Sequence, residues 1–98
     1  MSFAEELKNV QGNKLIEYAI EFAEEINPKL LESAEKGFTG YEIELEKRED
    51  AHMLRNSEFR KNLELLLEGC EVRIAKKEFT NLLLNKEFYK SYLVISWA

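Results

Sequence analysis

Residues 69–97 read GCEVRIAKKEFTNLLLNKEFYKSYLVISW, and this stretch decides the fold. It opens on Gly69, a residue that commonly follows the end of a helix. Cys70, Val72 and Ile74 then alternate with Glu71, Arg73 and Ala75. Such a period of two sends successive side chains to opposite faces of a sheet. The last part, Tyr92–Trp97, is β-branched and aromatic, which favours a strand. We therefore predict one strand near 70–75 and another at 92–97.

Residues 79–91 connect these strands and admit two interpretations. Phe79–Leu84 can extend the first strand into a long hairpin that turns near Asn85-Lys86. Alternatively, Thr80 can cap a short helix. We favour the hairpin, because asparagine accepts the positive φ that a tight turn requires.

Upstream, residues 41–46 read YEIELE and alternate apolar with acidic side chains. This pattern predicts a third strand with one apolar face and one acidic face. Arg73 and Lys77 can lie opposite the acidic face, in cross-strand pairs worth tenths of a kcal/mol each. Such pairing would explain the acidic strand without any function.

The remaining segments favour helix. In the first forty residues an apolar stripe follows helical spacing, formed by Leu15, Ala19, Phe22, Ile26 and Leu30. We expect Gly12 to break this helix after a short leading turn. Pro28 either kinks it or starts a second segment that ends at Gly37. Residues 47–56 form a connection with one helical turn, and Asn56 or Ser57 caps the next helix. Its predicted buried stripe is Phe59, Leu63, Leu66 and Leu67.

These elements combine into one α+β domain spanning residues 1–98. In the order αβαββ, we predict a three-stranded antiparallel sheet with helices packed on one face. The predicted inner face of the sheet consists of Tyr41, Ile43, Leu45, Val72, Ile74, Leu93, Ile95 and Trp97.

Charge and targeting signals narrow the class of protein. The net charge is −5, which argues against direct binding of nucleic acid, because such proteins need a surplus of lysine and arginine. Residues 1–49 hold twelve carboxylates against six cations. This excess of negative charge forms either a solvated helix face or an acidic docking surface. The single cysteine cannot form an internal disulfide. We see neither a signal peptide nor an apolar run long enough to cross a membrane, so we expect a cytoplasmic location.

The residues that usually carry chemistry are sparse. Cys70 lies on the same face of the predicted strand as Val72 and Ile74. We therefore favour a buried structural role for this cysteine over a role as a nucleophile. His52 lies beside Asp50 in a polar connection, and one histidine with one acid makes neither a triad nor a zinc site. The helical glutamates are expected to be solvated, and the four glycines are too far apart for a phosphate-binding loop. We therefore expect no catalytic, cofactor or metal site.

Aromatic residues crowd the last fifth of the chain and predict a partner-binding surface. Strand parity leaves Tyr92 and Val94 on the outer sheet face, where tyrosine suits an interface. The predicted C-terminal hairpin carries more apolar surface than a chain of this size can cover. Either the segment Phe3–Val10 folds over this surplus apolar surface, or a protein partner or a second copy covers it. The candidate partner-binding residues are Tyr92, Val94, Phe88, Tyr89, Glu42, Glu44 and Glu46.

Three stretches together resemble small proteins encoded by phages and prophages of Gram-positive bacteria. They are the helix leading into residues 37–45 (GFTGYEIEL), the leucine-rich helix closing before residues 71–74 (EVRI), and the terminal strand at 92–97 (YLVISW). The resemblance is one of style and element order, and it carries over no functional residues. Some small acidic phage proteins inhibit host enzymes. The resemblance therefore implies a non-enzymatic module that occupies a host protein; the alternatives are an assembly component and an acidic mimic of nucleic acid. Independently, the surplus apolar surface of the C-terminal hairpin and the wide apolar arc of the first helix predict a homodimer, with a monomer as the alternative.

Overall fold

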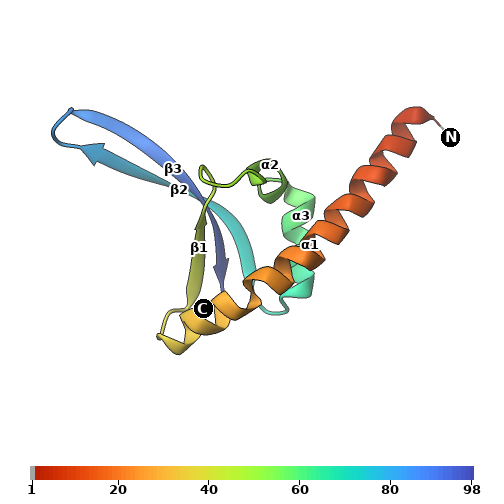
Figure 1. Cartoon of the computed structure of the whole chain (residues 1–98), viewed down its shortest axis with the longest axis horizontal. Coiled ribbons are helices and arrows are strands. Elements are labelled where there is room, and N and C mark those ends of the chain that lie inside the picture. Colours follow the sequence, from red (N-terminus) through yellow and green to blue (C-terminus); the bar gives the residue numbers. More distant parts are fainter. Residues whose placement is uncertain (1) are drawn as a thin grey trace.

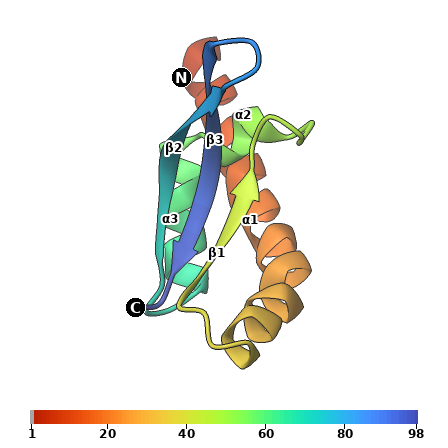
Figure 2. The ribbon, with the colours of Figure 1, turned by 90° about the vertical axis from the view of Figure 1, so that its left-hand side faces the viewer.

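An antiparallel sheet of three strands carries the helices α1 and α3 on one face and is open on the other (Figures 1 and 2). The computed structural model describes residues 2–98. Its elements are α1 (Phe3–Glu35), β1 (Gly40–Glu44), α2 (Ala51–Leu54), α3 (Ser57–Leu66), β2 (Glu71–Asn81) and β3 (Lys86–Ser96). The strand order β1-β3-β2 places the C-terminal strand in the centre. The predicted α+β class, with a three-stranded antiparallel sheet, is confirmed; α2 is the predicted helical turn in the connection.

Helix α1 is continuous, so the predicted break at Gly12 is wrong, and of the two alternatives at Pro28 the start of a second helix is excluded. Glycine disfavours a helix by only about 1 kcal/mol, which its helix-forming neighbours can offset. Around Pro28, Ile26 and Leu30 pack against the same core, which holds both sides of the proline in one helix. The predicted end is confirmed, because Gly37 follows the helix with a φ of 91°.

The core lies between the helices and the sheet. Phe22 of α1 and Phe59 of α3 meet edge to face with ring centroids 5.6 Å apart. Glu64 of α3 joins the layers by accepting a hydrogen bond from the backbone N–H of Val72. The buried cluster is Leu15, Ala19, Phe22, Ile26, Leu45, Leu54, Phe59, Leu63, Val72, Leu93 and Ile95.

Helix α3 begins and ends close to the predicted residues. Its cap is Asn56, whose side-chain oxygen accepts hydrogen bonds from the N–H groups of Glu58 and Phe59. Two details of its apolar stripe differ from the prediction. Leu66 is exposed, because it faces an open cleft between α1 and α3, and Leu67 is only partly buried.

Trp97 lies on the helix side of the sheet as predicted, where it lines a cleft with Leu30 and Leu67, but it is one residue beyond β3 and only half-buried. Its backbone N–H donates a hydrogen bond to the carbonyl of Thr39.

Beyond the three-stranded part, β2 and β3 continue alone as a two-stranded ribbon. Strand β1 pairs with β3 only from Gly40 opposite Ser96 to Glu44 opposite Tyr92. The pairing of β2 with β3 runs further, to Asn81 opposite Lys86. We call residues 76–90 the ribbon. The predicted hairpin is thus confirmed, and Asn85 adopts the expected positive φ, at 50°.

The ribbon and the N-terminal part of α1 extend from the body as two limbs of a V (Figure 1). Near the body, Leu7 and Val10 line a hollow with His52 and Met53 of α2. Phe3, Leu7 and Val10 are all exposed. The segment Phe3–Val10 therefore does not fold over the C-terminal hairpin. Of the two explanations for the surplus apolar surface, burial within the chain is excluded.

Candidate protein-binding surface

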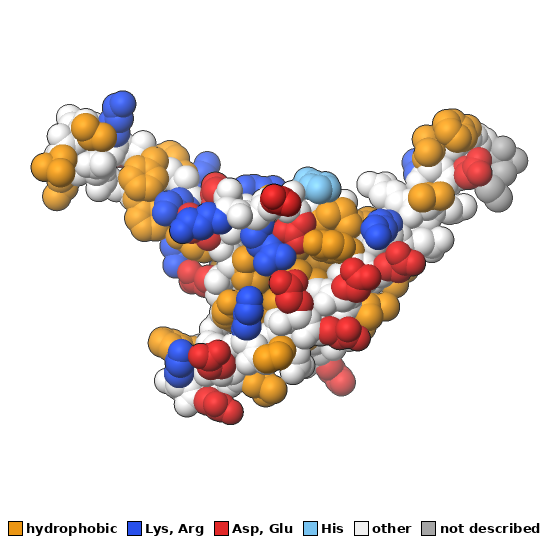
Figure 3. Space-filling model, in the orientation of Figure 1, with side chains coloured by type: hydrophobic (Ala, Val, Ile, Leu, Met, Phe, Trp, Pro, Cys, Tyr) orange, Lys and Arg blue, Asp and Glu red, His pale blue; other side chains and the backbone are white. Residues whose placement is uncertain are grey.

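The tip of the ribbon carries three consecutive leucines without apolar cover. Leu82, Leu83 and Leu84 are 89%, 96% and 64% exposed. The turn itself is well formed, since the side-chain oxygen of Asn81 accepts hydrogen bonds from the N–H groups of Leu83 and Leu84. The leucines are thus held outward by a defined turn. In Figure 3 they form the apolar cap at the far end of the molecule.

One face of the ribbon combines lysines with stacked aromatic rings. Phe79 and Phe88 lie opposite each other, with ring centroids 5.5 Å apart and planes 17° from parallel. Because side chains alternate between faces, the neighbouring rungs on this face bring Lys77 opposite Lys90 and Asn81 opposite Lys86. Lys90 also lies 5.5 Å from the Phe79 ring. We call this the lysine face. It bears three lysines and no carboxylate.

The acidic residues of β1 are largely neutralised. Lys77 Nζ of β2 lies 2.6 Å from a Glu42 carboxylate oxygen of β1, across the central strand β3, which confirms the predicted contact between Lys77 and the acidic row. Glu44 contacts both Lys90 and Lys47 at 3.2 Å, and the hydrogen bond from Lys90 lowers the pKa of its carboxyl. The expected contact of this row with Arg73 is not among the ion pairs of residues 2–98.

Glu46 departs from the predicted row, because β1 ends at Glu44. Its carboxylate accepts a hydrogen bond from the N–H of Ser91, which lowers the pKa of Glu46. Glu46 thus satisfies the edge of β3 where β1 stops, and it does not extend an acidic face.

The four apolar and aromatic candidates do not form one patch. Val94 is on the outer face as predicted, yet it is only 6% exposed, because neighbouring side chains cover it. Phe88 is exposed on the lysine face, and half-buried Tyr92 lies nearer the body with Lys77 5.0 Å from its ring. Tyr89 has the opposite parity and lies on the other face of the ribbon from Phe88, beneath Lys76. Phe88 and Tyr92 can contact one partner together; Val94 offers little surface.

A polar network that the sequence did not reveal ties α1 to the β1–α2 connection. The Arg48 guanidinium makes two hydrogen bonds to the Asp50 carboxylate, at 2.7 and 2.9 Å, and Tyr18 donates its hydroxyl to the same carboxylate. Hydrogen bonding to Arg48 lowers the pKa of Asp50 to about 2. Burial, followed by the hydrogen bond to Asp50, raises the pKa of Tyr18 to about 12. Arg48 also lies 5.3 Å from the Phe22 ring. These groups are mutually satisfied, which fits an anchor and not a reactive centre.

The remaining chemical candidates are isolated from one another. Cys70 is half-buried and packs against the core, as a structural cysteine does, and His52 is exposed. Within residues 2–98, no three side chains of the His, Cys, Asp or Glu types gather as a metal site would require. No helix in this same range combines the length and apolar character needed to traverse a bilayer.

The sequence pattern did not predict a second apolar region. A shallow cleft of about 470 Å³ lies between α1 and α3 and is lined by Ile20, Ala23, Glu24, Asn27, Pro28, Leu66 and Leu67. Leu66 was assigned to the core, so its exposure could not be foreseen. The only available signal was Ile16 and Ile20, which widen the stripe of α1 beyond what one small sheet can cover.

Comparison of the chain with protein-family models, with curated proteins and with solved structures found no match.

Proposed function

We propose that this protein is a small, non-enzymatic, intracellular protein-binding module whose binding surface is the ribbon with its leucine tip. The observation that carries the proposal is the exposure of Leu82, Leu83 and Leu84 on a well-formed turn that projects away from the core. Contiguous apolar surface of this kind is typical of interaction sites. An isolated two-stranded hairpin is also only marginally stable in water, so a ribbon of this length gains from a covering partner.

The ion pairs of β1 favour this apolar surface over an acidic docking surface. Glu42 and Glu44 already contact Lys77, Lys90 and Lys47, which reduces the charge they can offer to a basic partner. A nucleic-acid mimic would need these carboxylates free. The tip leucines and the stacked rings of Phe79 and Phe88 have no comparable partners among residues 2–98 to cover their apolar surface.

The resemblance to small phage and prophage proteins supports a host protein as the target. In that case the module acts by occupying its target's surface, without any chemistry of its own. A structural role in a larger assembly is the second candidate, favoured by the two limbs that diverge from one body (Figure 1). Such a role predicts higher-order particles in place of a discrete complex.

The test is capture of partners by tagged wild-type protein and by a Leu82→Ser/Leu83→Ser variant, from lysate of the organism that encodes the chain. Both leucines are exposed, so the variant keeps the fold, which circular dichroism checks. We expect a partner that the wild type retains and the variant loses, and that is retained when salt is raised. A matched Leu65→Ser variant changes an equally exposed leucine on α3 and should behave as wild type.

Equal capture by wild type and the tip variant would refute the proposal. Loss of capture with rising salt would favour the acidic surface instead. Tight direct binding of purified protein to DNA or RNA would contradict both.

A further inference from the structure

The chain exposes more surface than a folded monomer of its size. Its accessible surface is 7163 Å², whereas a monomer of this mass typically exposes about 5,800 Å². Its radius of gyration is 16.2 Å, against about 13 Å for a compact domain of this length. The excess, roughly 1,400 Å², exceeds the ~800 Å² that each partner contributes to a standard interface. The surplus is therefore enough for a stable dimer.

Both limbs of the V lack the contacts that normally stabilise such elements. Short helices without tertiary packing are marginal in water, as are two-stranded hairpins. The first three turns of α1 nevertheless carry apolar residues at Phe3, Leu7 and Val10, all exposed. Apolar residues lie near the far end of each limb, as the two separated orange regions in Figure 3 show.

The exposed residues of α1 follow a seven-residue repeat. Phe3, Val10, Glu17 and Glu24 are spaced by seven, and so are Leu7, Lys14 and Glu21. Residues at this spacing share one side of a helix. We call this side the heptad face; it is apolar at its N-terminal end, and further on it carries Glu17, Glu21 and Glu24 together with Lys14, which lies 3.8 Å from Glu17. It is distinct from the side that packs on the core through Leu15, Ala19, Phe22 and Ile26.

The ribbon presents the complementary order. It has leucines at its tip, followed towards the body first by Lys86 and then by the rung of Lys77 and Lys90, whose ammonium groups already contact Glu42 and Glu44. From Leu7 to Glu17 a helix rises about 15 Å, and from Asn81, where β2 ends, to Lys77 a strand spans roughly 13 Å. When the leucine tip is set against the apolar end of the heptad face, the Lys77–Lys90 rung therefore falls near Glu17, and Lys86, beside the turn, falls nearer the apolar end.

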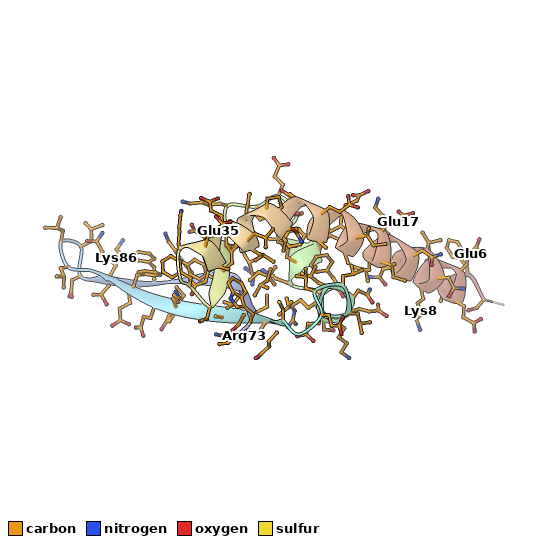
Figure 4. All side chains as sticks on the ribbon, turned by 90° about the horizontal axis from the view of Figure 1, so that it is seen from below. Glu6, Lys8, Glu17, Glu35, Arg73 and Lys86 are labelled. Atoms are coloured by element: carbon orange, nitrogen blue, oxygen red, sulfur yellow. The ribbon has the colours of Figure 1, made fainter. Side chains whose placement is uncertain are left out.

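The two surfaces also point the same way. In Figure 4, Glu17 on α1 and Lys86 on the ribbon project to one side of the molecule, whereas Arg73 projects to the other. Lys86 and Arg73 belong to the same sheet face by register, and the strong twist of a two-stranded ribbon turns that face around along its length. One partner on that side can thus meet both limbs.

We infer that the ribbon's partner is the heptad face of a second copy of this chain. This inference rests on the proposed function and names the partner's chemistry. In a two-fold symmetric dimer each ribbon covers the α1 limb of the other copy, so two identical junctions form. Each junction sets leucines against Phe3, Leu7 and Val10 and lysines against glutamates. Pairing through the free edge of β2 is disfavoured, because Lys76, Lys77 and Glu78 protect that edge with charge.

The test is a charge exchange between two variants. The ribbon variant carries Lys86→Glu and Lys90→Glu, and the helix variant carries Glu17→Lys and Glu21→Lys. In either homodimer both junctions bring like charges together, so we expect dimerisation at least about tenfold weaker than that of wild type in sedimentation-velocity titrations. In the mixed dimer one junction pairs two reversed surfaces and the other pairs two wild-type surfaces. Mixing the variants should therefore restore dimers of near wild-type affinity.

Circular dichroism first confirms that each variant is folded. The matched control reverses Lys61→Glu and Glu68→Lys, two exposed charges outside both faces, and should dimerise as wild type does. Failure of the mixture to recover would overturn the inference, and so would a wild type that stays monomeric up to submillimolar concentration. If that monomer still captured a lysate protein through its leucine tip, the proposed function would stand. Only the inference that the partner is a second copy of this chain would then be refuted.

Discussion

Leucine-to-alanine substitution should have very different consequences at positions 63 and 83. Leu63 is completely buried between α3 and the sheet, whereas Leu83 is 96% exposed at the ribbon tip. Truncating a buried leucine loses its transfer free energy and leaves a cavity, so Leu63→Ala should lower the free energy of unfolding by about 2–5 kcal/mol. For a domain of this length that corresponds to a fall in melting temperature of roughly 10–25 °C. Leu83→Ala should change the monomer's free energy of unfolding by less than about 0.5 kcal/mol.

The assay is urea unfolding followed by circular dichroism, at a protein concentration low enough to keep the chain monomeric. Repeating it at high concentration separates folding from association, because any partner that binds only the folded state adds apparent stability. At high protein concentration, Leu83→Ala should lack the increase in the free energy of unfolding that wild type shows. A cost above about 1 kcal/mol for Leu83→Ala at low concentration would refute the assignment of this leucine to a binding surface.

Further substitutions test the network around Asp50, the glycine that follows α1, and the expectation that Cys70 and His52 have no catalytic role. Asp50→Asn should lower the unfolding free energy at neutral pH by on the order of 1–2 kcal/mol, allowing for solvent screening. Because the folded pKa of Asp50 is depressed to about 2, wild type should lose this advantage as the pH falls from about 4 to 2, which acid titration of stability will show. Gly37→Ala should cost about 1–2 kcal/mol in thermal unfolding, since its φ of 91° strains any residue with a side chain. Cys70→Ser and His52→Ala should leave the affinity for any captured partner within about twofold, measured by titration calorimetry.

Most of the secondary structure could be predicted because local signals and packing agree. The alternation around Val72 and Ile74, the asparagine cap of α3 and the glycine after α1 each have a direct physical cause, and each was confirmed. The continuity of α1 could not be predicted in the same way. Local propensity at Gly12 and Pro28 argues for breaks, and only contacts with a core that the sequence does not display hold the helix together.

The candidate surface was predicted only in part. Sequence parity placed Tyr92 and Val94 on the outer face, but it could not show that neighbouring side chains cover Val94. Nor could it show where β1 ends, which decides that Glu46 leaves the acidic row. The length of the ribbon beyond β1 depends on strand register. That register is a property of the assembled sheet, and it is what leaves the leucine tip exposed.

Photo-crosslinking from the ribbon tip tests the central claim most directly. A benzophenone amino acid replaces Leu83 in purified protein, and a mixture of isotopically labelled and unlabelled chains distinguishes crosslinks between copies from those within one. We predict crosslinks between copies, ending on residues 3–14 of α1. The same group at exposed Leu65 should give no such products. If position 83 crosslinked no more between copies than position 65, or reached only the surface of its own chain, the ribbon would not be the surface through which two copies associate.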